Sequence, residues 1–376
     1  MTSRLSKGDV RLLAGGVVLT TGSAATRYSH AGRVLPFIVS AVALGVLAAI
    51  VGRSVDRLGD RLGSGMTGVV QSALGNLPEL FFGIFALRAG LVGVLQAALI
   101  GSILANVLLV LGLALIVGGL KHGTQHFRAD NARVVVVLLV LAVSVLMVPT
   151  LGVHLDIAVR HHKVALSDIA SVVLLVVFLL SAPRSVRREA TYEEEAGQAN
   201  GRHSEAGRDS HGEKRSGTSA PAPGWSVPLV LSSLLVSSIA AAFVSDWFVA
   251  ALSPALSALH MSEAFAGLVV VAIAGNAVEN VVGVQLAARN RTDYALSVIL
   301  QSPVQIALVL IPVLVLFSGV IGGAQLTLVL APFLAVVLAL TTLIAAIVVL
   351  DGESTWLEGA CLVGLYIVIA ASFWWG

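Results

Sequence analysis

Long apolar stretches recur along the chain from one end to the other, with polar connections between them. The stretches are continuous rather than alternating, and each can cross about 30 Å of hydrocarbon as a helix. Only helices and closed barrels satisfy all their backbone polar groups in lipid, and barrel strands would alternate. The pattern therefore predicts an all-α integral membrane protein with about eleven transmembrane helices. The predicted helices cover residues 11–27, 35–53, 66–88, 92–119, 132–151, 164–181, 226–250, 263–287, 294–318, 325–350 and 355–375.

One long polar stretch, residues 183–224, interrupts this pattern. It contains Glu193, Glu194 and Glu195 among basic residues and ends in Pro-Ala-Pro-Gly, a composition typical of a flexible linker. We interpret its short acidic run as solvated charge, with calcium sensing as the alternative. The linker divides the chain into an N-terminal segment with the first helix (1–34), a first half (35–182), the linker (183–224) and a second half (225–376).

The basic residues predict the orientation, because cytoplasmic loops carry more Lys and Arg. With a cytoplasmic N-terminus, 18 of the 23 lysines and arginines fall on the cytoplasmic side. We therefore expect a multi-pass protein of the plasma (inner) membrane, with the N-terminus and linker in the cytoplasm and the C-terminus outside.

The composition narrows the partners. Only 12% of the residues are charged and the net charge is +2, whereas soluble domains are about a quarter charged. We expect the protein to be surrounded by membrane lipid. Nucleic acid is not an expected partner, because the basic residues are scattered and form no single patch. The single Cys361 excludes an internal disulfide, and the absence of a Gly-Lys pair excludes a P-loop ATPase. No cofactor is expected, and a homo-oligomer is compatible with the sequence.

A five-residue motif occurs twice: Gly75–Glu79 (GNLPE) recurs as Gly275–Glu279 (GNAVE), 200 residues later. The same offset keeps Ser102 and Ser302 in register in the next predicted helix. The third and eighth of eleven helices run in opposite directions. The halves are therefore predicted to be inverted repeats of five helices each, following an extra first helix. This architecture is typical of secondary transporters, whose ion sites lie near the midplane.

Glu79 and Glu279 are acidic residues inside apolar helices, where a charge costs about 2.5–3.5 kcal/mol. Two such residues at equivalent positions indicate an ion site rather than two hydrogen-bonded structural groups. Mutual repulsion and poor hydration favour protonation of the pair once a cation leaves, so protons and the cation compete.

Amide and hydroxyl oxygens surround this pair in the sequence. Calcium takes six to eight oxygen ligands, and no Cys or His cluster favours zinc or copper. Helix breaks are expected to add backbone carbonyls. The predicted side-chain ligands are Asn76, Asn276, Ser102 and Ser302, with breaks at Gly75, Pro78, Gly275 and Pro303.

These motifs resemble a known family. Gly75-Asn76-x-x-Glu79-Leu80 with Gly101–Asn106 (GSILAN) resembles the first signature repeat of the calcium/proton exchangers (CAX), within the cation/calcium exchanger superfamily. Gly275–Glu279 with Ser302-x-x-Gln305-Ile306 resembles the second. The resemblance spans about residue 35 to the C-terminus. It implies that Glu79 and Glu279 are the central cation and proton ligands, and that the site is lined by Asn76, Asn276, Ser102, Ser302 and Gln305, with Asn106 as a further candidate.

One departure from the family bears on the coupling ion. The family usually carries a histidine after the second glutamate, and this chain has Asn280. We expect an antiporter, not an enzyme, that exchanges cytoplasmic Ca²⁺ for H⁺ by alternating access. Na⁺-coupled Ca²⁺ exchange or Na⁺/H⁺ exchange by the same fold is the alternative. An intramembrane enzyme that uses the two glutamates as an acid–base pair is another alternative, but the sequence shows no nucleophile or metal motif for it. A non-transporting ion sensor is a further alternative.

Overall fold

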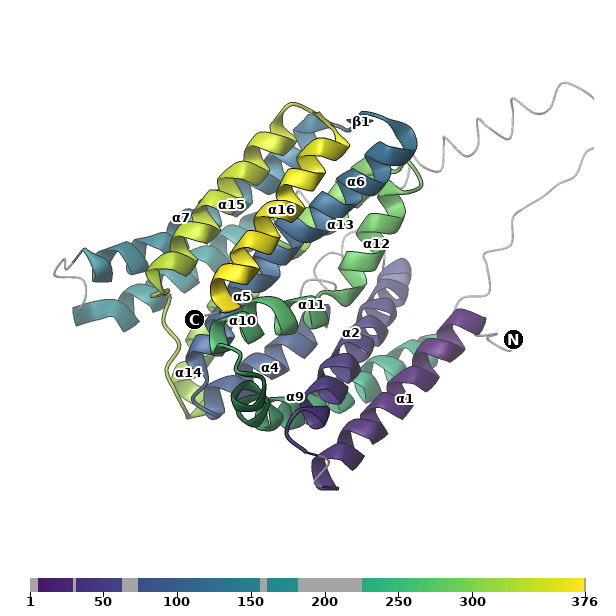
Figure 1. Cartoon of the computed structure of the whole chain (residues 1–376), viewed down its shortest axis with the longest axis vertical. Coiled ribbons are helices and arrows are strands. Elements are labelled where there is room, and N and C mark those ends of the chain that lie inside the picture. Colours follow the sequence, from purple (N-terminus) through teal and green to yellow (C-terminus); the bar gives the residue numbers. More distant parts are fainter. Residues whose placement is uncertain (1–5, 30–31, 63–73, 156–160, 182–224, 375–376) are drawn as a thin grey trace, which may run out of the picture.

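The computed structural model describes residues 6–29, 32–62, 74–155, 161–181 and 225–374, and these are mostly helical (Figure 1). Within this part of the chain, eight helices are long and apolar enough to cross a membrane, and one bent pair would make a ninth span. The protein is therefore a multi-pass membrane protein. The uninterrupted long helices are α1 (Lys7–Tyr28), α2 (Leu35–Leu62), α7 (Ala129–His154), α9 (Val227–Leu259), α15 (Pro332–Leu350), α16 (Trp356–Trp374) and the helix Lys163–Ser181.

The prediction of eleven transmembrane helices is confirmed in kind but not in number. Each predicted stretch contains helix among its described residues, yet α1 is not one of the eight apolar candidates. The linker 183–224, with Glu193, Glu194 and Glu195, lies outside the described residues. The count of eleven spans therefore stays a prediction.

Two of the predicted helices are interrupted at the repeated motif. Helix α4 (Leu77–Arg88) begins directly after Asn76, and α12 (Ala277–Ala287) begins directly after Asn276. The two asparagines have nearly the same backbone angles, φ −94° and ψ 20° against φ −97° and ψ 22°. A glycine precedes each of them, and Pro78, which has no N–H to donate, stands in the first turn of α4. Predicted helices 66–88 and 263–287 are thus not continuous.

The segment before the second break is itself composite. It consists of α10 (Glu263–Phe265), the π-helical η3 (Ala266–Val271) and α11 (Ala272–Gly275). Its axis makes an angle of 63° with the helix that follows. It packs closely on α5, because a Cβ at Gly101 would overlap the Leu268 backbone and one at Gly267 would overlap the Val94 carbonyl.

The internal repeat is present in the structure. Elements 200 residues apart begin and end within one residue of each other, and both series contain a π-helical segment that the sequence did not predict. Hairpin α4–α5 points to one end of the molecule and α12–α13 to the other (Figure 1), so the halves are inverted as predicted. The first series continues with α5 (Val92–Leu104), η1 (Ala105–Val110) and α6 (Leu111–His122), and the second with α13 (Thr292–Gln305), η4 (Ile306–Leu310) and α14 (Ile311–Ile321). Pro303 lies inside α13 and does not end it.

The predicted helix 325–350 is wrong at its start. Residues 322–331, which we call the strap, form a non-helical connection, and α15 begins only at Pro332. Positive φ angles at Gly322 (74°) and Gly323 (123°) turn the chain out of α14. Alternate leucines, Leu326, Leu328 and Leu330, are buried, so the strap satisfies a hydropathy window without being a helix.

A short pair of strands lies at the opposite end. Strand β1 (Gln125–His126) pairs antiparallel with β2 (Glu353–Ser354) in connections between helices, outside the apolar stretches. We call this the strand end of the molecule and the end with residues 322–331 the strap end (Figure 1).

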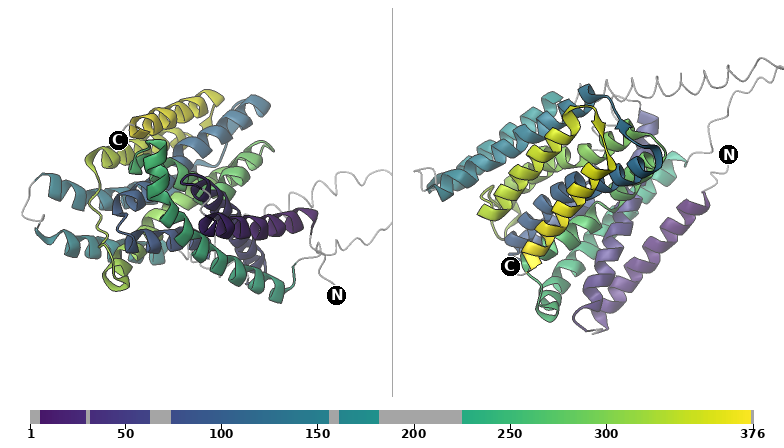
Figure 2. Two further views of the ribbon diagram at one scale, coloured as in Figure 1. Left: turned by 60° about the horizontal axis from the view of Figure 1, so that its bottom comes forward. Right: turned by 45° about the horizontal axis from the view of Figure 1, so that its top comes forward.

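Helices α1, α2 and α9 pack against one another along one side (Figure 1 and Figure 2). Asp9, near the start of α1, is buried between them. Its Oδ1 lies 3.3 Å from Arg53 Nε, and its Oδ2 accepts a 3.1 Å hydrogen bond from Trp225 Nε1. Burial alone would raise the pKa of Asp9, but hydrogen bonds from Trp225 and Ser6 and the charge of Arg53 outweigh it and hold that pKa below its ordinary value.

Candidate functional site

Glu79 lies where the two repeated motifs meet. It is in the first turn of α4, and its side chain rests against Gly275 of the other motif. A Cβ at Gly275 would lie 2.9 Å from Glu79 Oε1 and 3.3 Å from its Cγ. The Oε2 atom is shielded from solvent. The absence of a side chain at position 275 therefore makes the room that the carboxylate occupies.

The two glutamates occupy matching places in their helices. Glu79 is the third residue of α4 and Glu279 the third residue of α12. The first turn of a helix has unpaired N–H groups and the positive end of the helix dipole, which stabilise a carboxylate. The backbone of Glu279 is placed in this way, and its side chain lies outside what the structure describes.

Asn106 is the centre of a buried hydrogen-bond network. Its Nδ2 donates to Asn276 Oδ1 at 2.8 Å, to the Ser102 carbonyl at 3.0 Å and to Ser302 Oγ at 3.4 Å. Ser302 Oγ also donates to Asn276 Oδ1 at 3.2 Å. The side chain of Asn106 is fully buried, and those of the other three are nearly so. The sequence ranked Asn106 below the serines; only its spacing of four residues from Ser102 pointed to it.

A second pair of amide side chains, Asn76 and Gln305, also joins the two repeats. Asn76 Nδ2 donates to Gln305 Oε1 at 3.4 Å. The asparagine at each helix break is thus hydrogen-bonded to an amide side chain of the other repeat, Asn76 to Gln305 and Asn276 to Asn106. The structure therefore brings these predicted residues together at the two breaks.

Two further amide oxygens are buried. Among the described residues, Asn106 Oδ1 and Asn280 Oδ1 have no hydrogen-bond partner. Leaving such an oxygen buried and unsatisfied costs about 1–3 kcal/mol. Asn280 begins the turn after Asn276, and its N–H donates to the Asn276 carbonyl at 3.0 Å. Both oxygens are suited to accept a cation or a proton donor.

The chemistry of this set is that of hard oxygen ligands. The part of the chain that the structure describes has no cluster of three or more His, Cys, Asp or Glu residues that could hold a metal ion. A cation here would depend on glutamate carboxylates together with amide, hydroxyl and backbone oxygens.

A known protein family matches most of the chain. The profile of the sodium/calcium exchanger protein family matches residues 33–184 and 229–375. The chain belongs to this family. It is accordingly a secondary transporter and not an enzyme, and the resemblance inferred from the paired motifs is confirmed.

Relatives match over nearly the whole chain. A Ca²⁺/H⁺ antiporter of Aphanothece halophytica is 33% identical over 348 residues, which cover 92% of this chain and 91% of the relative. The Ca²⁺/H⁺ antiporter ChaA of Bacillus subtilis is 30% identical over 364 residues, or 96% of this chain and 97% of that one.

Solved structures share the fold. The structure of native YfkE aligns with a TM-score of 0.77 and 27% identity, covering 97% of this chain and 99% of that one. The H⁺/Ca²⁺ exchanger CAX aligns with a TM-score of 0.71 at 16% identity, covering 98% of this chain and 92% of that one. At this identity the match supports only a shared fold.

Proposed function

We propose that this exchanger carries Ca²⁺ out of the cytoplasm in return for H⁺, at a single site between the two helix breaks. The observation that carries the proposal is the position of Glu79 against Gly275, which unites the motifs of both repeats. Two relatives that are at least 30% identical are named Ca²⁺/H⁺ antiporters, which supports Ca²⁺ and H⁺ as the exchanged ions. The strand end, with Arg289 and Arg291 in the α12–α13 turn, is assigned to the cytoplasm.

In this proposal, Glu79 and Glu279 bind either the cation or protons. The positive ends of α4 and α12 stabilise both carboxylates while calcium is bound. The remaining ligands are the side chains of Asn76, Asn276, Ser102, Ser302, Gln305 and Asn106, with Asn280 nearby and backbone carbonyls at Gly75, Gly275 and Pro78. Alternating access follows when one group of helices rocks against a more rigid group around the glutamates, so that the site opens to one side at a time.

Transport in proteoliposomes tests the proposal. Calcium uptake is measured under an imposed proton gradient without sodium, in wild type, Glu79→Gln and Glu279→Gln. Gradient-driven uptake is expected in wild type and its loss in both variants. Glu263→Gln is the matched control, because Glu263 is exposed at the start of the composite helix that leads to the second motif. It should transport like wild type.

Sodium coupling is the competing function, favoured by Asn280 in place of the family's usual histidine. Uptake that appears only with a sodium gradient would replace H⁺ by Na⁺ in the proposal. If folded wild-type protein moves no cation under either gradient, transport of calcium by this chain is refuted.

A further inference from the structure

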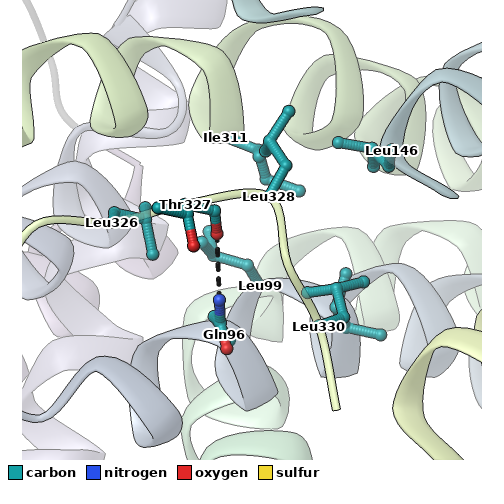
Figure 3. Close-up of a pocket in the computed structure, with 9 residues that line it drawn as sticks. Gln96, Leu99, Leu146, Ile311, Leu326, Thr327, Leu328 and Leu330 are labelled. Carbon is teal, nitrogen blue, oxygen red and sulfur yellow. Dashed lines mark hydrogen bonds between the residues drawn. The ribbon is translucent and has the colours of Figure 1, made fainter. Parts of the chain in front are cut away.

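The strap is fixed to the hairpin of the opposite repeat. Gln96 of α5 donates from Nε2 to the Thr327 carbonyl at 3.0 Å (Figure 3). The same Nε2 donates to the Val329 carbonyl, also at 3.0 Å. At the α4–α5 turn, Ala324 N donates to the Leu87 carbonyl at 3.1 Å. The strap belongs to the second repeat, and the hairpin carries Glu79 of the first.

Other side chains of the first half complete this attachment. Thr150 Oγ1 donates to the Leu328 carbonyl at 2.9 Å and accepts from Leu330 N at 3.1 Å. Leu328 N donates to Ser167 Oγ at 3.0 Å. A small cavity beside Gln96 is lined mainly by leucines, so an ion would find few ligands there (Figure 3). The strap is therefore suited to hold helices in place and not to conduct ions.

The strand end repeats this relationship with the halves exchanged. Gln125, which is 1% exposed, accepts a 2.7 Å hydrogen bond at Oε1 from Thr292 Oγ1. Arg128 N donates to Asp293 Oδ1 at 2.7 Å, and His122 Nε2 lies 3.1 Å from the Ala288 carbonyl. The connection after α6 of the first repeat thus holds the α12–α13 turn, whose helix carries Glu279 of the second.

We propose that Gln96 and Gln125 are positioning residues for ion binding. Gln96 fixes its own hairpin, α4–α5, to the strap of the second repeat, and Gln125 fixes the α12–α13 hairpin of the second repeat to the connection after α6. This inference rests on the proposed function. Helices α4 and α12 have 12 and 11 residues, and each joins a held turn to a glutamate at its other end. A helix of this length is a stiff rod of about 17 Å, so displacement of the turn displaces the glutamate.

The two glutamines act through different atoms, and this makes the inference testable. Gln125 Oε1 accepts the 2.7 Å hydrogen bond from Thr292, and a glutamate can replace it there, losing only the 3.3 Å bond from Nε2 to the Gly123 carbonyl. Gln96 Nε2 donates to two carbonyls, and an ionised glutamate cannot. Gln125→Leu, Gln96→Leu and Gln96→Glu should therefore raise the KM for Ca²⁺ on the order of tenfold with kcat changed less than about threefold. Gln125→Glu should stay within about threefold of wild type in both.

The experiment measures KM and kcat in proteoliposomes, together with amide hydrogen exchange of residues 88–91 and 288–291. Faster exchange is expected in the turn that the replaced glutamine holds, and not in the other turn. Thr124→Val is the control, since Thr124 is exposed and adjacent to Gln125. If Gln125→Leu does not fold, Thr292→Val removes the same hydrogen bond with a smaller change.

Equal effects of glutamate at both positions, or Leu variants with normal KM and normal turn protection, would overturn the inference. Failure of the proposed function is distinguishable, because wild type would then show no calcium exchange. Hydrogen exchange in the two turns would in that case decide on its own whether the glutamines hold the hairpins.

Discussion

The carboxylate of Glu79 occupies the space beside Gly275 that a side chain would otherwise fill. A Cβ at Gly275 would approach Glu79 Oε1 to 2.9 Å, closer than such carbons come to neighbouring atoms. Gly275 belongs to the second repeat and Glu79 to the first, so the glycine of one motif makes room for the acid of the other. The inverted repeat thus brings the two helix breaks into contact.

Gly275→Ala should displace the Glu79 side chain and lower calcium transport by at least about tenfold, with a small change in stability. One methyl group suffices because the nearest atoms belong to the carboxylate itself and its Cγ. The measurement is initial uptake in proteoliposomes beside thermal unfolding in detergent. Gly319→Ala is the control, since a Cβ at Gly319 meets nothing within 4 Å. Transport equal in the two variants would contradict this account of the site.

Asn106→Leu should weaken calcium binding more than Ser302→Ala does. The leucine removes the 2.8 Å hydrogen bond from position 106 to Asn276 Oδ1. This buried oxygen then accepts only the longer hydrogen bond from Ser302, which costs about 1–3 kcal/mol. The alanine removes only bonds of 3.2 and 3.4 Å. The apparent KM for Ca²⁺ checks the order, and a larger effect from Ser302→Ala would show that Asn106 is peripheral.

Much of the fold follows from local sequence. Continuous apolar stretches locate the helices, and the 200-residue offset between Glu79 and Glu279 reveals the inverted repeat. Both could be predicted because they depend only on the order of residues in the sequence. The strap could not be predicted, since Leu326, Leu328 and Leu330 raise a hydropathy average whether the backbone is helical or extended. Its extended form depends on Gln96, Thr150 and Ser167, which lie far away in sequence.

The candidate site was predictable in its residues but not in its pairing. The glutamates, asparagines and serines stand out as polar residues in apolar stretches. The bond between Asn106 and Asn276 depends on the close packing of α5 against the composite helix, which only the folded chain shows. The π-helical segments η1 and η4 likewise were not predicted from the sequence.

Asn280→His should add a proton-dependent transition to calcium transport between about pH 6 and 7, where histidine titrates. The position is partly buried next to the second break, and Asn280 itself does not titrate in this range. The measurement is initial uptake against pH with a fixed proton gradient, and Asn280→Gln is the control for size and polarity. Identical pH profiles for all three proteins would show that the protonation of residue 280 does not affect calcium transport.

Asp9→Asn should destabilise the protein at neutral pH, and less so in acid. The pKa of Asp9 lies below its ordinary value of 3.8, so the charged form stabilises the folded state above that value, and this stabilisation is lost as the pH falls through the lower folded-state pKa. Asparagine can still accept the Trp225 hydrogen bond, so the variant tests the charge and its contact with Arg53. Thermal unfolding in detergent should give a lower Tm than wild type at pH 7, corresponding to about 1–3 kcal/mol, and a smaller difference near about pH 3. Asp246→Asn, at an exposed aspartate of α9, should show no difference at either pH. An equal loss of Tm at both pH values would mean that the side chain contributes through its shape and not through its charge.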